Sequence, residues 1–155
     1  MKRLLLILLS LLCLAGVLSA CGSEKAVTEV DFTALSGELL DSGIYSDLMS
    51  PLDKDIAAML YSVDAGCISE YVLYCGTGAT GEEIALFKAA DSESAAAIAA
   101  AAQQRKSDQI ESFKNYVPSE VPKIEKAVIK TNGQFVAYIV SCDADKAAEI
   151  LKKYM

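Results

Sequence analysis

Residues 127–142 read AVIKTNGQFVAYIVSC, and this stretch decides the fold of the chain. Asn132-Gly133 is the strongest two-residue signal for a β-hairpin, because both residue types accept the positive φ of a tight turn. Residues 127–131 before the turn and 135–142 after it are rich in β-branched, aromatic and large apolar side chains. The sequence therefore predicts two antiparallel strands joined at this turn.

A second hairpin is predicted upstream, from residues 68–75 and 83–89. Residues 68–75 are rich in aromatic and large apolar side chains and are bounded by glycines, and residues 83–89 are predicted as a second strand. The connection between them is the six-residue stretch 76–81, GTGATG. Together the two hairpins predict a four-stranded antiparallel sheet.

Each hairpin is followed by a segment with helical periodicity. Asp91 or Ser92 begins the first helix, which runs to about Tyr116 before Pro118 and Pro122 form a stiff connection. Asp143 caps a final helix that carries Ala147, Ile150, Leu151 and Tyr154 on one side. The inner stripe of the long helix comprises Ala95, Ile98, Ala99, Ala102, Ile110, Phe113 and Val117, interrupted by Lys106 and Gln109.

Two short amphipathic helices are predicted before the first hairpin. Asp31 is a suitable cap for the first, which carries its large apolar residues on one stripe and stops at Ser42-Gly43. The second begins at Asp53, after Pro51. Runs of strands and helices in this order predict an α+β domain with helices packed on an antiparallel sheet.

The two halves of the chain share an internal similarity. With an offset of 52 positions, Ala85, Asp91 and Ile98 align with Ala137, Asp143 and Ile150, and two alanine positions between them also coincide. The domain could therefore contain a duplicated ββα unit, although an alanine-rich chain also produces such identities by coincidence.

The strands lack a clean alternation of apolar and polar residues. Residues 71–75 and 135–140 are almost entirely apolar, so both faces of the sheet need cover. We expect the two later helices to cover one face and the two N-terminal helices the other. If a face stayed bare, Tyr74, Phe87 and Tyr138 would contribute to an exposed partner surface.

The beginning of the chain predicts its location. Lys2 and Arg3 precede an apolar run over residues 4–18, which is typical of a secretory signal and shorter than the ~20 residues of a membrane-spanning helix. Leu18-Ser19-Ala20-Cys21 resembles the lipobox of bacterial lipoproteins. The resemblance implies cleavage between Ala20 and Cys21 and a diacylglyceryl group on Cys21, with chains such as palmitate.

This reading divides the chain into three parts. Residues 1–20 are the predicted signal peptide, residues 21–30 the lipidated cysteine with a short tether, and residues 31–155 a single α+β domain. The predicted location is the extracytoplasmic face of the cell membrane, with the lipid as the anchor. An uncleaved anchor and a plain secretory signal are the alternatives.

Composition excludes several classes of function. The chain has 14 basic and 21 acidic residues, a net charge of −7, which disfavours nucleic acid as a partner. Histidine is absent, which excludes Ser-His-Asp and Cys-His nucleophile systems and any zinc site that uses imidazole. No cofactor and no metal are predicted, and a catalytic role is disfavoured.

Several motifs resemble catalytic or binding sites. Residues 76–81 fit G-x-G-x-x-G, but a dinucleotide site needs a helix directly afterwards, where a strand is predicted. Glu82 and Glu83 would point to opposite faces of that strand, and we interpret them as solvated charges at its end. Asp143-Ala144-Asp145 lacks the glycine and glutamate of a calcium loop, which leaves helix capping as the favoured role.

Three cysteines lie in the predicted domain: Cys67, Cys75 and Cys142. An odd number leaves at least one thiol free or paired between chains. Cys67 and Cys75 on one extended strand are too far apart for a disulfide, whereas Cys142 could meet either. Buried free thiols are favoured over a disulfide.

Three segments resemble one family. Residues 83–88, 115–118 and 133–136, which read EIALFK, NYVP and GQFV, are similar in order and spacing to the domain-of-unknown-function family numbered 4358. The resemblance covers roughly residues 31–154 and implies a small lipoprotein of a Gram-positive bacterium. It implies no activity, cofactor or catalytic residue.

Three classes of function follow, in this order. A non-catalytic envelope module that binds another protein or itself fits the lipid anchor, the small size and the absence of histidine. A lipoprotein that binds a small ligand as an accessory to a transporter is second. A cell-wall hydrolase is third, and it would need two carboxylates about 5–9.5 Å apart in one groove.

Overall fold

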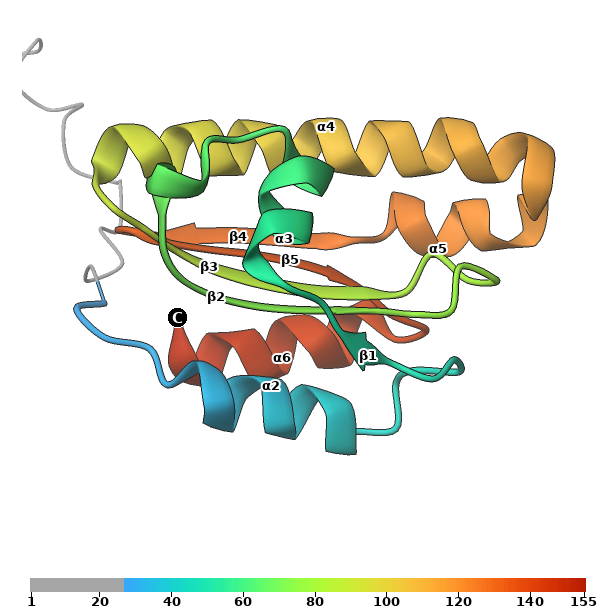
Figure 1. The fold of residues 1–155 in the computed structure, drawn as a ribbon. Coiled ribbons are helices and arrows are strands. Elements are labelled where there is room, and N and C mark those ends of the chain that lie inside the picture. The colour runs from blue at the N-terminus through green and yellow to red at the C-terminus, as the bar shows by residue number, and fades with distance from the viewer. Residues whose placement is uncertain (1–26) are drawn as a thin grey trace, which may run out of the picture.

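Figure 1 shows the computed structural model of the chain, which describes residues 27–155. In chain order the elements are α2 (Phe32–Asp41), β1 (Ser50–Pro51), α3 (Lys54–Tyr61), η1 (Ala65–Cys67), β2 (Ile68–Cys75), β3 (Glu83–Ala89), α4 (Ser92–Tyr116), η2 (Pro118–Glu120), α5 (Val121–Glu125), β4 (Val128–Asn132), β5 (Phe135–Val140) and α6 (Ala144–Tyr154). The α+β class predicted from the sequence is confirmed.

The sheet has five strands in the order β1-β2-β3-β5-β4, and every neighbouring pair is antiparallel. The predicted number of four strands is therefore wrong. The additional strand is β1, in which Ser50 pairs with Cys75 and Pro51 with Tyr74. A strand of two residues that includes proline has no hydrophobic period, and for this reason the sequence carries no signal for it.

Helices cover both faces of the sheet, as Figure 1 shows. α3 and α4 pack on one face, and α2 and α6 pack on the other. The central strands β3 and β5 are buried on both faces, which explains their continuous apolar sequence. The expectation that the two later helices share one face is wrong, because each face receives one later helix and one N-terminal helix.

The predicted partner surface is also wrong. Phe87 and Tyr138 are completely buried in the core beneath α3 and α4. Tyr74 is half-buried on the opposite face, against the core beneath α2 and α6. The three side chains therefore form no common exposed patch, and the expectation that helices cover both faces is confirmed.

Aspartate caps begin three of the helices. The carboxylates of Asp31, Asp91 and Asp143 accept hydrogen bonds from the backbone N–H three residues ahead, at 2.9, 2.7 and 2.9 Å. Each satisfies a donor that the first turn of a helix leaves unpaired. The caps predicted at Asp31 and Asp143 are confirmed, and of the two candidates Asp91 and Ser92 the cap of the long helix is Asp91.

The connection between α4 and β4 contains helical structure that the sequence analysis did not predict. Pro118 begins η2, and Pro122 lies in the first turn of α5. Proline suits these positions, because the first turn of a helix has N–H groups without intrahelical acceptors. The two prolines thus end α4 and also start the short helices after it.

The β4–β5 hairpin is confirmed, with its turn one residue later than predicted. Asn132 pairs with Phe135, which leaves Gly133 and Gln134 as the two turn residues. Gly133 has a φ of +58°, in the left-handed region that side chains disfavour. Asn132 instead accepts a hydrogen bond from the backbone N–H of Val27 at 3.0 Å.

Two glycine substitutions should change stability in opposite directions. Gly133→Ala is expected to lower the free energy of unfolding by about 1 kcal/mol, because alanine resists the left-handed conformation. Gly37→Ala is expected to raise it by about 0.8 kcal/mol, because Gly37 lies in α2 with nothing within 4 Å of an added Cβ. Urea unfolding of both variants measures the difference, and equal effects would contradict this account of the turn.

The predicted signal peptide and the sites Ala20 and Cys21 lie outside the described residues. Residues 27–30, which the sequence assigned to the tether, already contact the domain. Val30 is buried in the core beneath α2 and α6, and Val27 packs against the same core. Within residues 27–155, no helix is long and apolar enough to cross a membrane.

Candidate functional site

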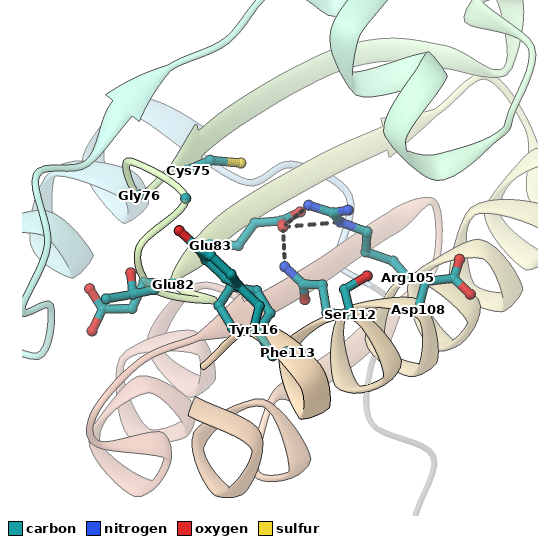
Figure 2. A pocket seen from close by; sticks show the side chains of 12 residues that line it. Cys75, Gly76, Glu82, Glu83, Arg105, Asp108, Ser112, Phe113 and Tyr116 are labelled. Carbon is teal, nitrogen blue, oxygen red and sulfur yellow. Dashed lines mark hydrogen bonds and ion pairs between the residues drawn. The ribbon is translucent and has the colours of Figure 1, made fainter. Parts of the chain in front are cut away.

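A pocket of about 310 Å³ lies between the second half of α4 and the connection from β2 to β3. Figure 2 shows its side chains. Its lining residues are Cys75, Gly76, Gly78, Thr80, Glu82, Glu83, Arg105, Asp108, Gln109, Ser112, Phe113 and Tyr116. Its volume is at the lower end of the roughly 300–1,000 Å³ typical of small-ligand sites.

Helical spacing brings the wall of the pocket together. Arg105, Gln109, Ser112 and Tyr116 follow one another at three- and four-residue intervals, and such residues occupy one side of a helix. The opposite wall comes from the β2–β3 hairpin, whose two strands pair from Ile68 to Cys75. The pocket is thus a product of helix periodicity and hairpin geometry.

The floor of the pocket is the carboxylate of Glu83, which is completely buried. Its Oε2 accepts hydrogen bonds from Nε and Nη2 of Arg105, at 3.1 and 2.8 Å, and from Nε2 of Gln109, at 3.0 Å. Its Oε1 accepts a hydrogen bond from the hydroxyl of Tyr61 at 2.7 Å. Tyr138 donates to Oε1 of Gln109 at 2.5 Å, so two strands and two helices meet in one polar network.

The network fixes the protonation states of its members. Burial alone would lower the pKa of Arg105, but the charge of Glu83 and the hydrogen bonds to it, together with smaller contributions from Tyr61 and Cys75, outweigh burial and raise that pKa. Burial, and then the charge of Glu83, raise the pKa of Tyr61 and of Tyr138. Arg105 is therefore charged and both tyrosines are neutral donors, as the hydrogen bonds require.

Cys75 lies at the edge of this network and lines the pocket. Burial, followed by the charge of Glu83, raises the pKa of its thiol to about 12. Because the thiolate is the nucleophile, this cysteine is not activated at neutral pH. Among residues 27–155 all three cysteines are free, as predicted, but they are not fully buried: Cys67 and Cys75 are half-buried and Cys142 is exposed.

Glu82 forms a second polar network on the other side of β3. Its carboxylate accepts from the backbone N–H of Ser46 and of Asp47, each at 2.9 Å, and from the hydroxyl of Ser46 at 2.7 Å. Nζ of Lys123 donates to it at 2.9 Å and the thiol of Cys142 at 3.1 Å. These contacts join the loop after α2, the start of β3, α5 and the end of β5.

The hydrogen bonds to Glu82 keep it ionised. Burial alone would raise the pKa of Glu82, but the bonds from Ser46, Lys123 and Cys142 outweigh it and lower that pKa to about 2. Burial alone would lower the pKa of Lys123, but its hydrogen bonds to Glu120 and Glu82 raise that pKa. The carboxylate of Glu82 is therefore a structural anion.

The interpretation of Glu82 and Glu83 as solvated charges is wrong. Both are buried, at 2% and 0% exposure. The expectation that they point to opposite faces is confirmed, because they belong to separate networks. Arg105 was not identified from the sequence, and Gln109 was noted only as an interruption of an apolar stripe. That interruption was the one local signal that a polar side chain on this helix is buried against a polar partner.

The G-x-G-x-x-G stretch is held in place by Asp47. The Asp47 carboxylate accepts from the N–H of Thr77 and from the hydroxyls of Thr77 and Thr80, each at 2.9 Å. Gly78 adopts a φ of +91° within this loop. Strand β3 follows the loop, so the helix required by a dinucleotide site is missing at this position.

The residues described offer no metal site. Within residues 27–155, no group of three or more Cys, Asp or Glu side chains is arranged to hold a metal ion. The carboxylates of Glu82 and Glu83 are each engaged by a protein cation, Lys123 and Arg105 respectively. The hydrolase hypothesis therefore finds no pair of free carboxylates facing one groove at this position.

Comparisons with known proteins place the chain in a family. The family described as "Domain of unknown function (DUF4358)" matches residues 42–141, which is more than half of the 155 residues. No curated protein and no solved structure matches the chain significantly. The matched segment contains the whole sheet and all the residues that line the pocket. The chain therefore belongs to the DUF4358 family.

Proposed function

We propose that the protein is a lipoprotein, anchored through Cys21 to the extracytoplasmic face of the cell membrane, and that it binds a ligand without catalysis. The lipobox-like Leu18-Ser19-Ala20-Cys21 supports the anchor. The pocket beside α4 supports the binding role, and it is the observation that carries the proposal. A small ligand or a short segment of a partner chain fits a site of this size.

The position of the pocket fits a tethered protein. Val27 contacts the β4–β5 turn, and in the register of β3 with β5 this turn lies at the Lys88 end of β3. The pocket lies at the Glu83 end, about 17 Å away along the strand. In Figure 1 the chain enters on the left, while the β2–β3 connection lies on the right. A lipid joined before Val27 would leave the pocket directed away from the membrane.

The chemistry of the pocket supports binding over catalysis. The Glu83 carboxylate is completely buried and accepts hydrogen bonds from Arg105, Gln109 and Tyr61, which supports a structural role over that of a general base. The raised pKa of Cys75 argues against a nucleophile at that position. What remains open to a ligand is a set of hydrogen-bond donors and an aromatic surface.

The anchor is tested by a single substitution. Cys21→Ser is expected to move the protein from the membrane fraction to the soluble extracellular or periplasmic fraction, because serine cannot form the thioether. Cys13→Ser is the matched control, since Cys13 lies within the apolar run and should leave the fractionation unchanged. Membrane retention of Cys21→Ser would contradict the proposed anchor.

The binding role is tested by ligand-induced stabilisation of the detergent-solubilised full-length protein. A compound present at 100 times its dissociation constant should add about 2.7 kcal/mol to the free energy of unfolding. The effect should be lost in Tyr116→Ala and kept in Met59→Ala, since these side chains are similarly exposed, at 69% and 65%, and only Tyr116 lines the pocket. No stabilisation by any charged or uncharged compound would contradict the proposed function.

A further inference from the structure

We infer that the pocket takes an uncharged ligand that presents an amide carbonyl oxygen to Arg105 and an apolar face to Phe113 and Tyr116. This inference names the ligand class for the proposed function and rests on it. Three observations carry it: the charges of the lining, the donors that remain unused, and the exposed aromatic surface.

The charges of the lining favour an uncharged ligand. Glu82, Glu83 and Asp108 outnumber Arg105, which disfavours a phosphate-like anion. Glu82 and Glu83 are each engaged by a protein cation, so neither has a free charge for a cationic ligand. Asp108 accepts from Nε2 of Gln104 at 2.8 Å, and in Figure 2 its carboxylate points away from Arg105. The interior of the pocket therefore offers no unpaired charge.

The free polar groups of the pocket are mainly donors. Arg105 uses one N–H of Nη2 and its Nε–H on Glu83, which leaves further guanidinium donors without a partner within residues 27–155. Its side chain is 20% exposed and lines the pocket. The hydroxyl of Ser112, two turns along α4, also has no hydrogen-bond partner in the described part of the chain. A carbonyl oxygen is an acceptor that suits the remaining guanidinium donors, and the hydroxyl of Ser112 offers a separate polar contact farther along the same wall.

An aromatic surface stands beside these donors. The ring of Tyr116 is 69% exposed and meets the ring of Phe113 edge to face, with centroids 6.2 Å apart. Gly76 and Gly78 present backbone without side chains on the opposite wall. The flat apolar side of a ligand can stack on the exposed tyrosine ring while its carbonyl reaches Arg105. An amide next to an apolar ring or side chain combines both requirements.

Two sources carry this chemistry, an N-acetylated sugar and an uncharged stretch of peptide. Calorimetric titration of the lipidated, detergent-solubilised full-length protein distinguishes them. One arm compares di-N-acetylchitobiose with cellobiose, which lacks the acetamido groups. The other compares N-acetyl-dialanine amide with N-acetyl-dialanine, which carries a carboxylate. In at least one arm, the uncharged amide is expected to bind tenfold or more tightly than its comparator.

Variants connect this binding to the pocket. Tyr116→Ala and Ser112→Ala are expected to weaken binding of the preferred amide at least tenfold and about threefold, respectively. Both side chains are exposed, so neither substitution should unfold the protein. Met59→Ala should bind as the natural sequence does, because Met59 lies on α3, outside the lining.

Each remaining result overturns the inference in a recognisable way. If cellobiose or the charged peptide binds as tightly as its amide partner, and Tyr116→Ala abolishes that binding, the ligand class is wrong and the proposed function stands. If the amides bind but Tyr116→Ala binds equally well, the site is wrong. If neither amide binds, the ligand class is wrong, and the wider stabilisation screen then decides whether the proposed function fails as well.

Discussion

Glu83→Gln is expected to lower the free energy of unfolding by about 3–5 kcal/mol, which is the typical cost of removing one partner from a buried ion pair. Glutamine has nearly the same shape, so the cost comes from leaving the charge of Arg105 buried opposite a neutral group. Nε2 of Gln109 would also lose its charged acceptor. Domains of this size are stable by about 5–15 kcal/mol, and the variant should still fold at low temperature.

Urea unfolding measures this effect, with the fluorescence of the tyrosines as the signal. The control is Glu111→Gln, which breaks the exposed pair with Lys114 and should cost less than about 1 kcal/mol. The double variant Glu83→Gln, Arg105→Met removes both charges and should recover part of the lost stability, since no uncompensated charge remains. A cost for Glu83→Gln no larger than that of Glu111→Gln would refute the account of the pocket floor.

Glu82→Gln is expected to lower the free energy of unfolding by about 3 kcal/mol at neutral pH, because it removes hydrogen bonds to a charged acceptor. The amide group of glutamine would also face the donors of Ser46 and Lys123. The loop after α2 and the helix α5 should therefore loosen together. In Glu82→Gln we expect the backbone amides of both segments to exchange hydrogen faster than they do in the natural sequence.

The effect of Glu82 should depend on pH. The pKa of Glu82 is about 2 in the folded protein, compared with 4.5 for a glutamate without such contacts, as in the unfolded chain. As the pH falls, the unfolded chain therefore takes up this proton before the folded protein does. The stability that Glu82 contributes is complete above pH 4.5 and is lost as the pH falls toward about 2. The difference in stability between the natural sequence and Glu82→Gln should therefore shrink over this range, and a constant difference would contradict the mechanism.

Much of the fold could be predicted from the sequence because its elements carry local signals. The limits of the two strands of the first hairpin, 68–75 and 83–89, and of the helix 92–116 are those expected from composition and caps. β1 could not be predicted, because its pairing with β2 depends on the path of the whole loop before it. The distribution of helices between the two faces likewise depends on packing between distant segments.

The site was harder to predict than the fold. Adjacent acidic residues at the start of a strand are usually solvated, and nothing local to Glu83 indicates that Arg105, 22 positions later, neutralises it. That contact depends on how α4 lies across the sheet. The sequence shows Gln109 as a polar residue in an apolar stripe, but its hydrogen bond with Tyr138 could not be predicted without the position of Tyr138 in the fold. Buried polar networks join segments that are far apart in sequence, which single-sequence patterns do not record.

The two borders of the sheet have a consequence for a protein held on a surface. Copies held by the proposed lipid anchor would diffuse in two dimensions, side by side on the membrane. Open strand edges would then let neighbouring molecules join into continuous sheets. On one border the two-residue strand β1 covers the Tyr74–Cys75 end of β2, and its Pro51 cannot donate a backbone hydrogen bond. The other border carries Lys130 in the middle of β4. Pro51 and Lys130 therefore both oppose edge-to-edge joining of sheets at the places where they stand.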